Sequence, residues 1–272
     1  MSATSQPTQA GPTPAATDLT AFINGRFTAA GGEPHRHAVI DPATEQTVGE
    51  LLESDAAQVD AAVRAARAAF DTGAWSRQST DRRQACMLRV RDLILRNADA
   101  LAASECTNTG IPYPQLRQLH IPGAAHHFQF YAELASQLKG ELHQQRSGYQ
   151  LQVSREPVGV AALISPWNGP VNMSCAKIAA ALAFGNSCVL KPSEYTPLAF
   201  VRLMEIFREA GIPDGVVNMV NGRGAVTGAA LASHPGIDLV SFTGGSVSGP
   251  LVNAAAARNL KRTTMELGGK SA

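Results

Sequence analysis

The sequence has few cysteines, few aromatic residues and almost no net charge. Four of its 272 residues are Cys, 6% are aromatic, and 23 basic residues are balanced by 22 acidic ones. This balance excludes the strongly basic surface that binding to nucleic acid or to an anionic membrane requires. No apolar run approaches the ~20 residues needed to cross a bilayer. The composition therefore predicts no nucleic-acid partner and no membrane partner.

The cysteines are far apart in the chain and lie at Cys86, Cys106, Cys175 and Cys188. Their spacing matches neither the close pairs of a metal site nor the dense pattern of a disulfide framework. The adjacent His126 and His127 would point to different sides of a helix, which does not favour a metal site either. The sequence thus predicts no bound metal and a reducing, cytoplasmic location.

Residues 1–17 differ in composition from the rest. They are rich in Ser, Thr, Pro, Ala, Gln and Gly, and they contain no basic residue and no apolar segment. Such a stretch cannot bury enough apolar surface to fold, and it lacks the basic and apolar regions of a signal peptide. We expect a disordered tail here. The remaining chain, in a protein that is 44% hydrophobic, is long enough for a substantial core.

The most informative stretch runs from residue 158 to residue 194. The unbroken apolar run Val158 to Ile164 is typical of a strand buried on both faces of a parallel sheet. A turn follows, then apolar residues at helical spacing up to Gly185, and a second short apolar run that leads into Lys191. This pattern predicts a β-α-β unit with polar groups at the carboxyl ends of its strands, where doubly wound sheets bind ligands.

The β-α alternation continues to the last residue, so residues 158–272 are predicted to form one Rossmann-like core in an α/β fold. Residues 18–139 contain a short hairpin with Asn24-Gly25 as its turn, a strand around residues 47–52 and several helical patterns, the first with Asp55 as its N-cap and the last interrupted at Pro122-Gly123. These residues are predicted to form a helical layer. Residues 140–157 alternate between apolar and polar, which is typical of a half-buried strand or a surface hairpin.

Four short motifs stand at or near the ends of predicted strands: Pro166-Trp167-Asn168, Lys191-Pro192-Ser193-Glu194, Phe242-Thr243-Gly244 and Met265-Glu266-Leu267-Gly268-Gly269-Lys270. In their order and spacing they resemble the motifs of the aldehyde dehydrogenase superfamily. The resemblance runs from about Phe22 to Ala272. It implies NAD-dependent oxidation of an aldehyde to a carboxylate through a thioester. It also makes residues 140–157 an oligomerisation arm and the full-length form a homo-oligomer, a dimer or a tetramer.

The resemblance assigns catalytic roles to Asn168 and Glu266. The amide of Asn168 would stabilise the oxyanion, and Glu266 would be the general base for thioester hydrolysis, with its pKa raised by burial. The family's nucleophilic cysteine lies beyond Ala272. The chain is therefore expected to be an N-terminal fragment without the catalytic domain, unable to turn over alone. Cys175 falls on the apolar face of a predicted helix, which indicates a structural thiol.

The resemblance also implies a dinucleotide site. Lys191 and Glu194 would hold the adenosine ribose, although a solvated ion pair is the alternative. Glu194 should repel a 2′-phosphate and so favour NAD, while Ser193 keeps NADP as an alternative. The backbone before the helix that follows Ser246 would meet the pyrophosphate. The residues assigned to the cofactor are Ile164, Ser165, Pro166, Trp167, Lys191, Ser193, Glu194, Gly224, Phe242, Thr243, Gly244, Gly245, Ser246, Leu267 and Gly268.

Two other functions fit the same residues. One is a non-catalytic nucleotide-binding module that joins oligomers of a longer relative. The other is a related thiol dehydrogenase that forms an acyl phosphate or, as a semialdehyde dehydrogenase, acyl-CoA. Glu266 argues against acyl-CoA formation, because such an enzyme needs no water-activating base. The absent half would leave apolar surface uncovered, so the sequence further predicts self-association of the isolated chain.

Overall fold

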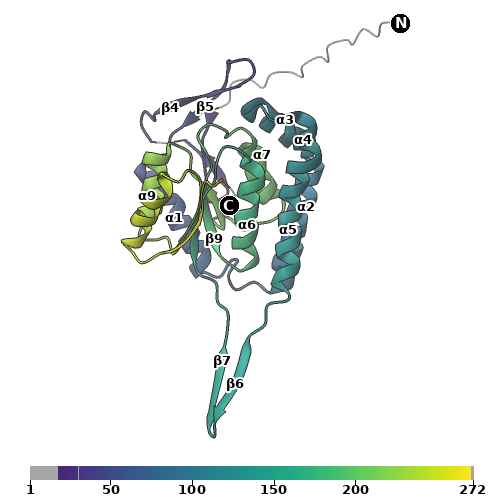
Figure 1. Ribbon diagram of the computed structural model, residues 1–272, viewed down its shortest axis with the longest axis vertical. Coiled ribbons are helices and arrows are strands. Elements are labelled where there is room, and N and C mark those ends of the chain that lie inside the picture. The colour runs from purple at the N-terminus through teal and green to yellow at the C-terminus, as the bar shows by residue number, and fades with distance from the viewer. Residues whose placement is uncertain (1–17, 30, 271–272) are drawn as a thin grey trace, which may run out of the picture.

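The computed structural model describes residues 18–29 and 31–270. The tail expected at residues 1–17 lies outside them. Within them, helices cover both faces of a central sheet, a small second sheet lies at one end, and a two-stranded arm projects from the other end (Figure 1). No helix in the described ranges is long and apolar enough to span a membrane.

The central sheet has seven strands in the order β12-β11-β8-β9-β10-β2-β3. Five of them run parallel, as predicted. These are β8 (Val160–Ile164), β9 (Ser187–Lys191), β10 (Val217–Met219), β11 (Leu239–Thr243) and β12 (Arg262–Glu266). The chain moves from β8 toward β10 on one side and returns to β11 and β12 on the other. The strand order therefore reverses between β8 and β11, the position at which open α/β sheets bind ligands.

The antiparallel edge of this sheet comes from the predicted hairpin. Strands β2 (Ala21–Ile23) and β3 (Arg26–Thr28) flank Asn24 and Gly25, whose φ angles are 50° and 78°. Two consecutive positive φ angles are the geometry for which Asn-Gly is selected in tight hairpins. Phe22 pairs with Met219 and attaches the hairpin to β10. The hairpin itself was predicted from the sequence, but its place in the central sheet was not.

One face of the sheet is covered by α1 (Ala56–Asp71), α8 (Ala229–Ser233) and α9 (Ser248–Ala257). Helix α1 begins as the sequence predicts, because the Asp55 carboxylate accepts a hydrogen bond of 2.7 Å from the Gln58 backbone N–H. Its buried stripe packs on alternate residues of β8 and on Val189 of β9. This layer positions the amino end of α9 at the edge where the parallel strands end.

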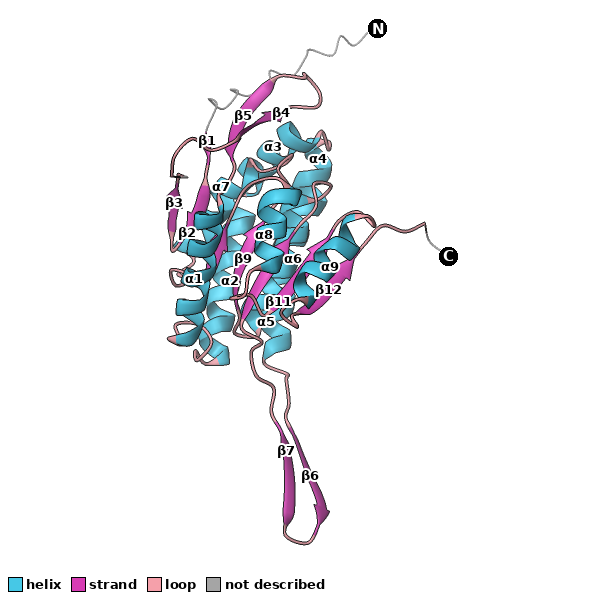
Figure 2. Ribbon diagram, turned by 90° about the vertical axis from the view of Figure 1, so that its left-hand side faces the viewer, coloured by secondary structure: helices cyan, strands magenta, loops and turns pink. Residues whose placement is uncertain are grey.

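The opposite face carries the larger core, with Phe128, Phe200 and Phe207 fully buried. Its helices are α2 (Thr80–Arg96), α3 (Ala98–Thr109), α5 (Ile121–Ala135), α6 (Pro170–Ala183) and α7 (Ala199–Glu209) (Figure 2).

The helix break expected at Pro122-Gly123 is wrong. The chain stays helical from α4 (Tyr113–Gln115) through the π-turn η1 (Leu116–His120) into α5. Pro122 lies in the first turn of α5, where a missing N–H is tolerated. The wider π-turn immediately before it accommodates the change in hydrogen bonding.

A three-stranded sheet, ordered β1-β5-β4, lies beyond the central layers. It consists of β1 (Asp18–Leu19), β4 (Arg36–Ile40) and β5 (Thr47–Leu52). The sequence indicated only β5. Leu19, Val39, Val48 and Leu51 form a small core of their own. The segment after β10 that contains Gly222, Gly224 and Gly228 is called the glycine loop here. The end of β5 brings Glu53 and Ser54 to this loop, where both form hydrogen bonds.

The projecting arm consists of β6 (Glu141–Arg146) and β7 (Tyr149–Val153) (Figure 2). Every residue of both strands is exposed, so the expected half-buried strand is wrong for this chain and the surface hairpin is confirmed. The apolar side chains of the arm, including Leu142 and Tyr149, face solvent. A lone hairpin of this kind is marginally stable in water.

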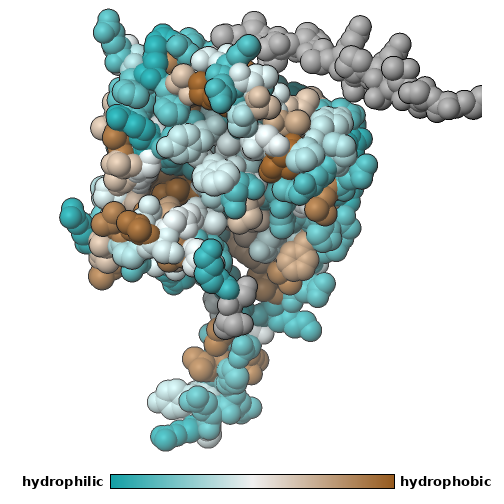
Figure 3. All heavy atoms as spheres, turned by 45° about the horizontal axis from the view of Figure 1, so that its top comes forward, coloured by the Kyte–Doolittle hydropathy of each residue, from teal (hydrophilic) through white to brown (hydrophobic). Residues whose placement is uncertain are grey.

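Apolar side chains are also exposed around α9. Val247, Leu251 and Leu260 are 84%, 69% and 93% exposed. On the face drawn in Figure 3 the hydrophobic residues form separate patches among hydrophilic ones. Apolar area of this kind favours association. Self-association of the chain stays a prediction, which sedimentation velocity can test.

Candidate active site

The ends of four parallel strands lie in register at one edge of the sheet. Ile164 at the end of β8 pairs with Lys191 on β9 and with Phe242 on β11. Thr243 pairs with Glu266 at the end of β12. The pairings bring the four sequence motifs to the same edge, around the point where the strand order reverses. The site predicted from the sequence is therefore a single region of the molecule.

Lys191 and Glu194 form a buried ion pair rather than a solvated one. Their side chains are 3% and 16% exposed, and Lys191 Nζ lies 3.1 Å from Glu194 Oε2. Nζ also donates to the Pro192 carbonyl oxygen at 2.9 Å. Burial lowers the pKa of Lys191, and Glu194 partly offsets this. Burial acts to raise the pKa of Glu194, but Lys191 and nearby backbone N–H groups outweigh it and keep that carboxyl ionised.

The other carboxylate oxygen of Glu194 faces the glycine loop. The Gly224 backbone N–H donates to Glu194 Oε1 at 3.3 Å, which places Gly224 beside the pair as expected. A Cβ on Gly228 would lie 3.7 Å from Lys191 Cδ, so this loop packs along the lysine stem. Ser193 is buried, and its hydroxyl accepts the Tyr195 backbone N–H at 3.3 Å. The role of Ser193 is thus to shape the turn that carries Glu194.

The turn between β11 and α9 presents backbone N–H groups. The Gly244 backbone N–H donates a hydrogen bond of 3.0 Å to the Glu266 carbonyl oxygen. Gly245 and Ser246 are exposed, and their backbone N–H groups donate to no described residue. They precede α9, whose amino end carries a partial positive charge. The hydroxyl of Thr243 is buried without a hydrogen-bond partner among the described residues. An anion with several acceptor oxygens suits this arrangement.

Two glycines at this edge lie in close contact with neighbouring side chains. A Cβ on Gly244 would lie 2.5 Å from Phe242 Cζ, and one on Gly249 would lie 2.6 Å from Leu267 Cδ2. Phe242 is buried, and Leu267 is 43% exposed beside α9. A Cβ on Gly268 would be 3.1 Å from Ser246 Oγ, so the segment after β12 passes against the turn before α9.

The residues fit a dinucleotide in donor and acceptor chemistry. The Lys191–Glu194 pair offers one donor and one acceptor for paired ribose hydroxyls. The amino end of α9 and the Thr243 hydroxyl offer uncommitted donors for a pyrophosphate. Across residues 18–29 and 31–270, no group of three His, Cys, Asp or Glu side chains is arranged to hold a metal ion.

The loop after β8 holds Trp167 and Asn168 at the surface. Trp167 is 60% exposed and Asn168 is also exposed, whereas Ser165 is buried and bonded to the Ser174 hydroxyl at 2.7 Å. The loop is anchored where it enters α6, because the Val171 N–H in the first turn of that helix donates a hydrogen bond of 2.9 Å to Glu105 Oε1 on α3. An exposed amide on an anchored loop is suited to contact a reacting oxygen.

Glu105 was not singled out from the sequence. It lies within α3, is 1% exposed, and its Oε2 has no hydrogen-bond partner among the described residues. Burial raises the pKa of Glu105 to about 7, and the Val171 N–H lowers it by a smaller amount. The signal that could have found it is a single glutamate on the buried side of a helix, a position where acids are rare unless they have a partner.

Changing Glu105 to Gln should remove a pH dependence of stability. Because the pKa of Glu105 is about 7 in the folded chain, the carboxyl keeps its proton up to that pH, whereas the unfolded chain loses it near the ordinary glutamate pKa of 4.5. The protonated carboxyl therefore contributes stability below pH 4.5 that is lost as pH rises through 7, in total roughly 3 kcal/mol. Glutamine stays neutral and still accepts the Val171 N–H.

Urea unfolding at several pH values between 4.5 and 8 tests this prediction. The difference in unfolding free energy between wild type and Glu105→Gln should move by roughly 3 kcal/mol in favour of the variant as pH rises. Glu133→Gln, an exposed change on α5, is the control and should give a constant difference. Parallel curves for wild type and Glu105→Gln would contradict the assignment.

Glu266 is exposed at the end of β12, so the burial expected for it is wrong in this chain. The strand-end position is as predicted, but β12 is the outermost strand and no described element covers its other side. Lys177 on α6 lies within electrostatic reach of Glu266. Burial lowers the pKa of Lys177 to about 8, and Glu266 acts in the opposite direction. Lys177 Nζ donates to the Ser241 hydroxyl at 2.8 Å.

Lys177 was also missed from the sequence. It is the only charged residue in the otherwise apolar and small-residue helix α6, which was a usable signal. Its hydrogen bond to Ser241 links α6 to β11, the strand that ends at Thr243.

Three of the four cysteines are buried thiols that are unsuited to be a nucleophile, and the half-buried Cys106, on α3, lies outside the four motifs. All are free, and Cys86, Cys175 and Cys188 are buried. Burial raises the pKa of the Cys175 thiol, with the Glu105 charge adding to it, and raises the pKa of Cys188 to about 12. A thiol with a raised pKa is inert at neutral pH. The prediction that Cys175 is a structural thiol on the apolar face of α6 is confirmed.

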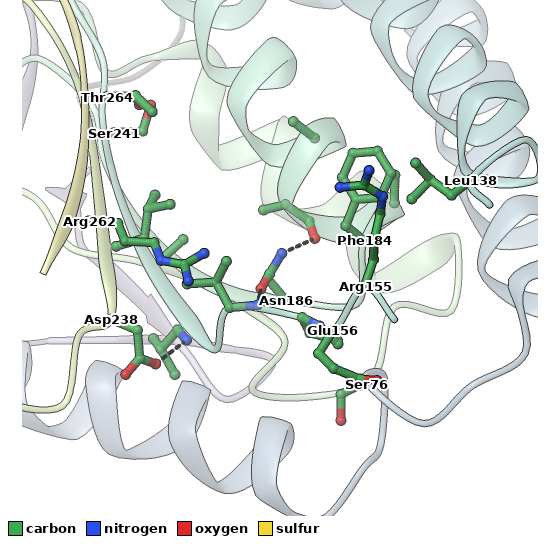
Figure 4. A pocket seen from close by; sticks show the side chains of 18 of the residues that line it. Ser76, Leu138, Arg155, Glu156, Phe184, Asn186, Asp238, Ser241, Arg262 and Thr264 are labelled. Atoms are coloured by element: carbon green, nitrogen blue, oxygen red, sulfur yellow. Dashed lines mark hydrogen bonds between the residues drawn. The ribbon is translucent and has the colours of Figure 1, made fainter. Parts of the chain in front are cut away.

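A large hollow in the described chain lies away from this edge. It has a volume of about 1450 Å³ and opens between the base of the arm, α6 and the starts of β8, β11 and β12. Arg155, Asp238 and Arg262 point into it or lie along its wall (Figure 4). None of the residues predicted to bind a cofactor lines it. We therefore place the candidate site at the carboxyl ends of the strands and not in this hollow.

Comparison with known proteins agrees with this arrangement. Residues 28–272 match the family described as "Aldehyde dehydrogenase family". The NADP/NAD-dependent aldehyde dehydrogenase PuuC of Escherichia coli is 41% identical over 252 residues, which are 92% of this chain and 51% of that protein. The 3-succinoylsemialdehyde-pyridine dehydrogenase of a Pseudomonas species is 44% identical, with 92% and 51% covered.

Solved structures give the same result. The P. syringae indole-3-acetaldehyde dehydrogenase AldA, solved in complex with NAD+, is 40% identical with a TM-score of 0.90, covering 93% of this chain and 51% of that one. An NAD+ complex of aldehyde dehydrogenase from Bacillus cereus is 39% identical with a TM-score of 0.90, covering 94% and 52%. The chain thus spans about half the length of the relatives it matches. Since the family match covers nearly all of it, the chain belongs to the aldehyde dehydrogenase family.

Proposed function

We propose that this chain is the cofactor-binding part of an NAD-dependent aldehyde dehydrogenase. The observation that supports this most is the buried Lys191–Glu194 pair at the end of β9, one strand from the point where the strand order reverses and in register with the end of β11 before α9. The relatives solved with NAD+ have this fold. Glu194 favours NAD over NADP, because a carboxylate at the ribose repels a 2′-phosphate. NADP remains the alternative cofactor.

The proposed reaction converts an aldehyde, NAD and water to a carboxylate and NADH through an enzyme thioester. The bound nicotinamide supplies the hydride acceptor. Lys191 and Glu194 hold the ribose, and the turn at Gly245 and Ser246 binds the pyrophosphate. Asn168 donates to the oxygen that becomes negative when a thiolate adds to the aldehyde. Glu266 accepts a proton from the water that cleaves the thioester.

The four buried or half-buried thiols of this chain supply no nucleophile, so we propose that it binds the cofactor and does not turn over without a cysteine-bearing partner segment. The same observation keeps the non-catalytic nucleotide-binding module as a second candidate. Steady aldehyde-dependent NADH formation by the purified chain would contradict both. Glu266 argues against the acyl-CoA-forming alternative, because transfer of the acyl group to CoA needs no base that activates water.

The partners and location follow from the same proposal. The exposed strands of the arm offer unpaired backbone groups to a second subunit, which supports a homo-oligomer. Four free cysteines suit a reducing cytoplasm. The proposed substrate is a small-molecule aldehyde.

Replacing Lys191 with Met should weaken NAD binding about tenfold to a hundredfold. The change removes the donor to the ribose and leaves Glu194 without its counter-charge, and hydrogen bonds to charged groups contribute about 1.5–3 kcal/mol. Isothermal titration of the chain with NAD measures the effect. Lys139→Met, at an exposed position before the arm, is the control and should bind as wild type does. Equal affinity of wild type and Lys191→Met would contradict the site.

A further inference from the structure

The glycine loop beside Glu194 is held by an ion pair that the proposed function does not use. Glu53 follows β5 and its side chain is 8% exposed. It accepts three hydrogen bonds, and all come from Arg223. The Arg223 backbone N–H and Nε each lie 2.9 Å from Glu53 Oε2, and Nη2 lies 2.8 Å from Oε1. One carboxylate thus fixes both the backbone and the guanidinium of the same residue.

Neighbouring contacts make this attachment rigid. The Ser54 N–H donates to the Asn221 carbonyl oxygen at 2.7 Å, and the Asn221 N–H donates back to Ser54 Oγ at 3.1 Å. Gly222 has a φ of 144°, and a Cβ there would lie 2.7 Å from Glu53 Cγ. Only glycine allows the two segments to come this close. The loop therefore has one position relative to the end of β5.

The attachment continues into the ribose pair. Gly224, the residue after Arg223, donates its backbone N–H to Glu194, and Glu194 pairs with Lys191. Hydrogen bonding from Arg223 is the main cause that lowers the pKa of Glu53 to about 2. The pKa of Arg223 is raised, first by Glu53 and to a smaller extent by Glu194. Two carboxylates and two cations thus form one group with a net charge of zero.

An arginine next to the adenosine ribose is the side chain that accommodates a 2′-phosphate in NADP. In this chain the Arg223 guanidinium already donates two hydrogen bonds to the Glu53 carboxylate, so the positive charge of Arg223 is balanced before a ligand binds. We propose that Glu53 is a positioning residue that engages Arg223 and thereby makes the site select an unphosphorylated ribose. The proposal rests on the proposed function, because it requires the Lys191–Glu194 pair to hold the ribose.

The test compares two ligands that carry only the adenosine end, 5′-AMP and 2′,5′-ADP. Each is titrated calorimetrically into the full chain. In Glu53→Gln the amide keeps the shape and can still accept the Arg223 N–H, but the four-group cluster gains one positive charge. The affinity for 2′,5′-ADP relative to 5′-AMP should rise about tenfold or more, as a charge-assisted pair predicts. In Glu53→Gln combined with Arg223→Met this gain should disappear.

A single Arg223→Met change should lower the affinity for 2′,5′-ADP relative to that for 5′-AMP, because the four-group cluster then carries one excess negative charge. This variant also decides the question if Glu53→Gln does not fold. Glu50→Gln, on the strand β5 that precedes Glu53 and in the exposed pair with Arg36, is the matched control and should leave the ratio unchanged.

A ligand ratio that does not change in Glu53→Gln or Arg223→Met, or a gain that persists without Arg223, would overturn the inference while the cofactor site stands. Destabilisation alone would lower both affinities and leave their ratio constant, so the ratio separates a positioning role from a structural one. Failure of wild type to bind either ligand would instead overturn the proposed function, and the inference with it.

Discussion

Replacing Glu266 with Gln is expected to lower steady-state aldehyde oxidation about 10²- to 10⁴-fold, the range that a positioned general base contributes. Glutamine has nearly the same shape but cannot take a proton from water. Addition of a thiolate to the aldehyde and hydride transfer do not need this base, so only hydrolysis of the thioester should slow.

The measurement requires a nucleophile, so it is made on a joined enzyme in which this chain is followed by the remaining part of P. syringae AldA. Rapid mixing with aldehyde and NAD should give a burst of about one NADH per site in Glu266→Gln, followed by a slow steady rate. The joined enzyme with Glu33→Gln, an exposed glutamate, is the control and should turn over as the parent does. A loss of both burst and steady rate would assign Glu266 an earlier role and contradict this one.

Changing Asn168 to Ala should lower the rate of the first NADH-forming turnover about 10²- to 10³-fold, the usual effect of removing one oxyanion donor. The amide is exposed on the loop between β8 and α6, and the Glu105–Val171 bond holds the first turn after it. The interaction forms only when the aldehyde oxygen becomes negative, so the loss should appear in the rate and not in the affinity for NAD.

Single-turnover kinetics of the joined enzyme and calorimetric titration with NAD test this together. The burst rate should fall while the dissociation constant for NAD stays within about twofold of the parent value, a difference of less than 0.5 kcal/mol. Asn259→Ala, an exposed asparagine after α9, is the control. An unchanged burst rate, or a matching loss of NAD affinity, would contradict an oxyanion role for Asn168.

Local patterns predicted most of the elements. The apolar run at residues 158–164 became β8, Asp55 caps α1, and the Asn-Gly turn closes the β2–β3 hairpin. These signals depend on neighbouring residues, so the sequence displays them directly. The attachment of β2 to β10 could not be read in this way, because it depends on Phe22 meeting a strand almost 200 residues later.

Some residues of the candidate site could be identified from the sequence, and others could not. The resemblance of four motifs to a known family singled out Lys191, Glu194 and Glu266, and the parallel pairing of the strands brings the ends that carry them to one edge. Glu105 and Glu53 were missed because their partners, Val171 and Arg223, are distant in the sequence and are contacted through backbone N–H groups that no residue type reveals. The exposure of Glu266 was missed because burial depends on which element covers an edge strand.

The most direct measurement of the central claim is a crystal structure of this chain grown with NAD. We predict the adenosine ribose between Lys191 and Glu194 and the pyrophosphate at the amino end of α9. Binding of NAD in the hollow lined by Arg155 and Arg262, with the strand ends unoccupied at saturating NAD, would contradict the account.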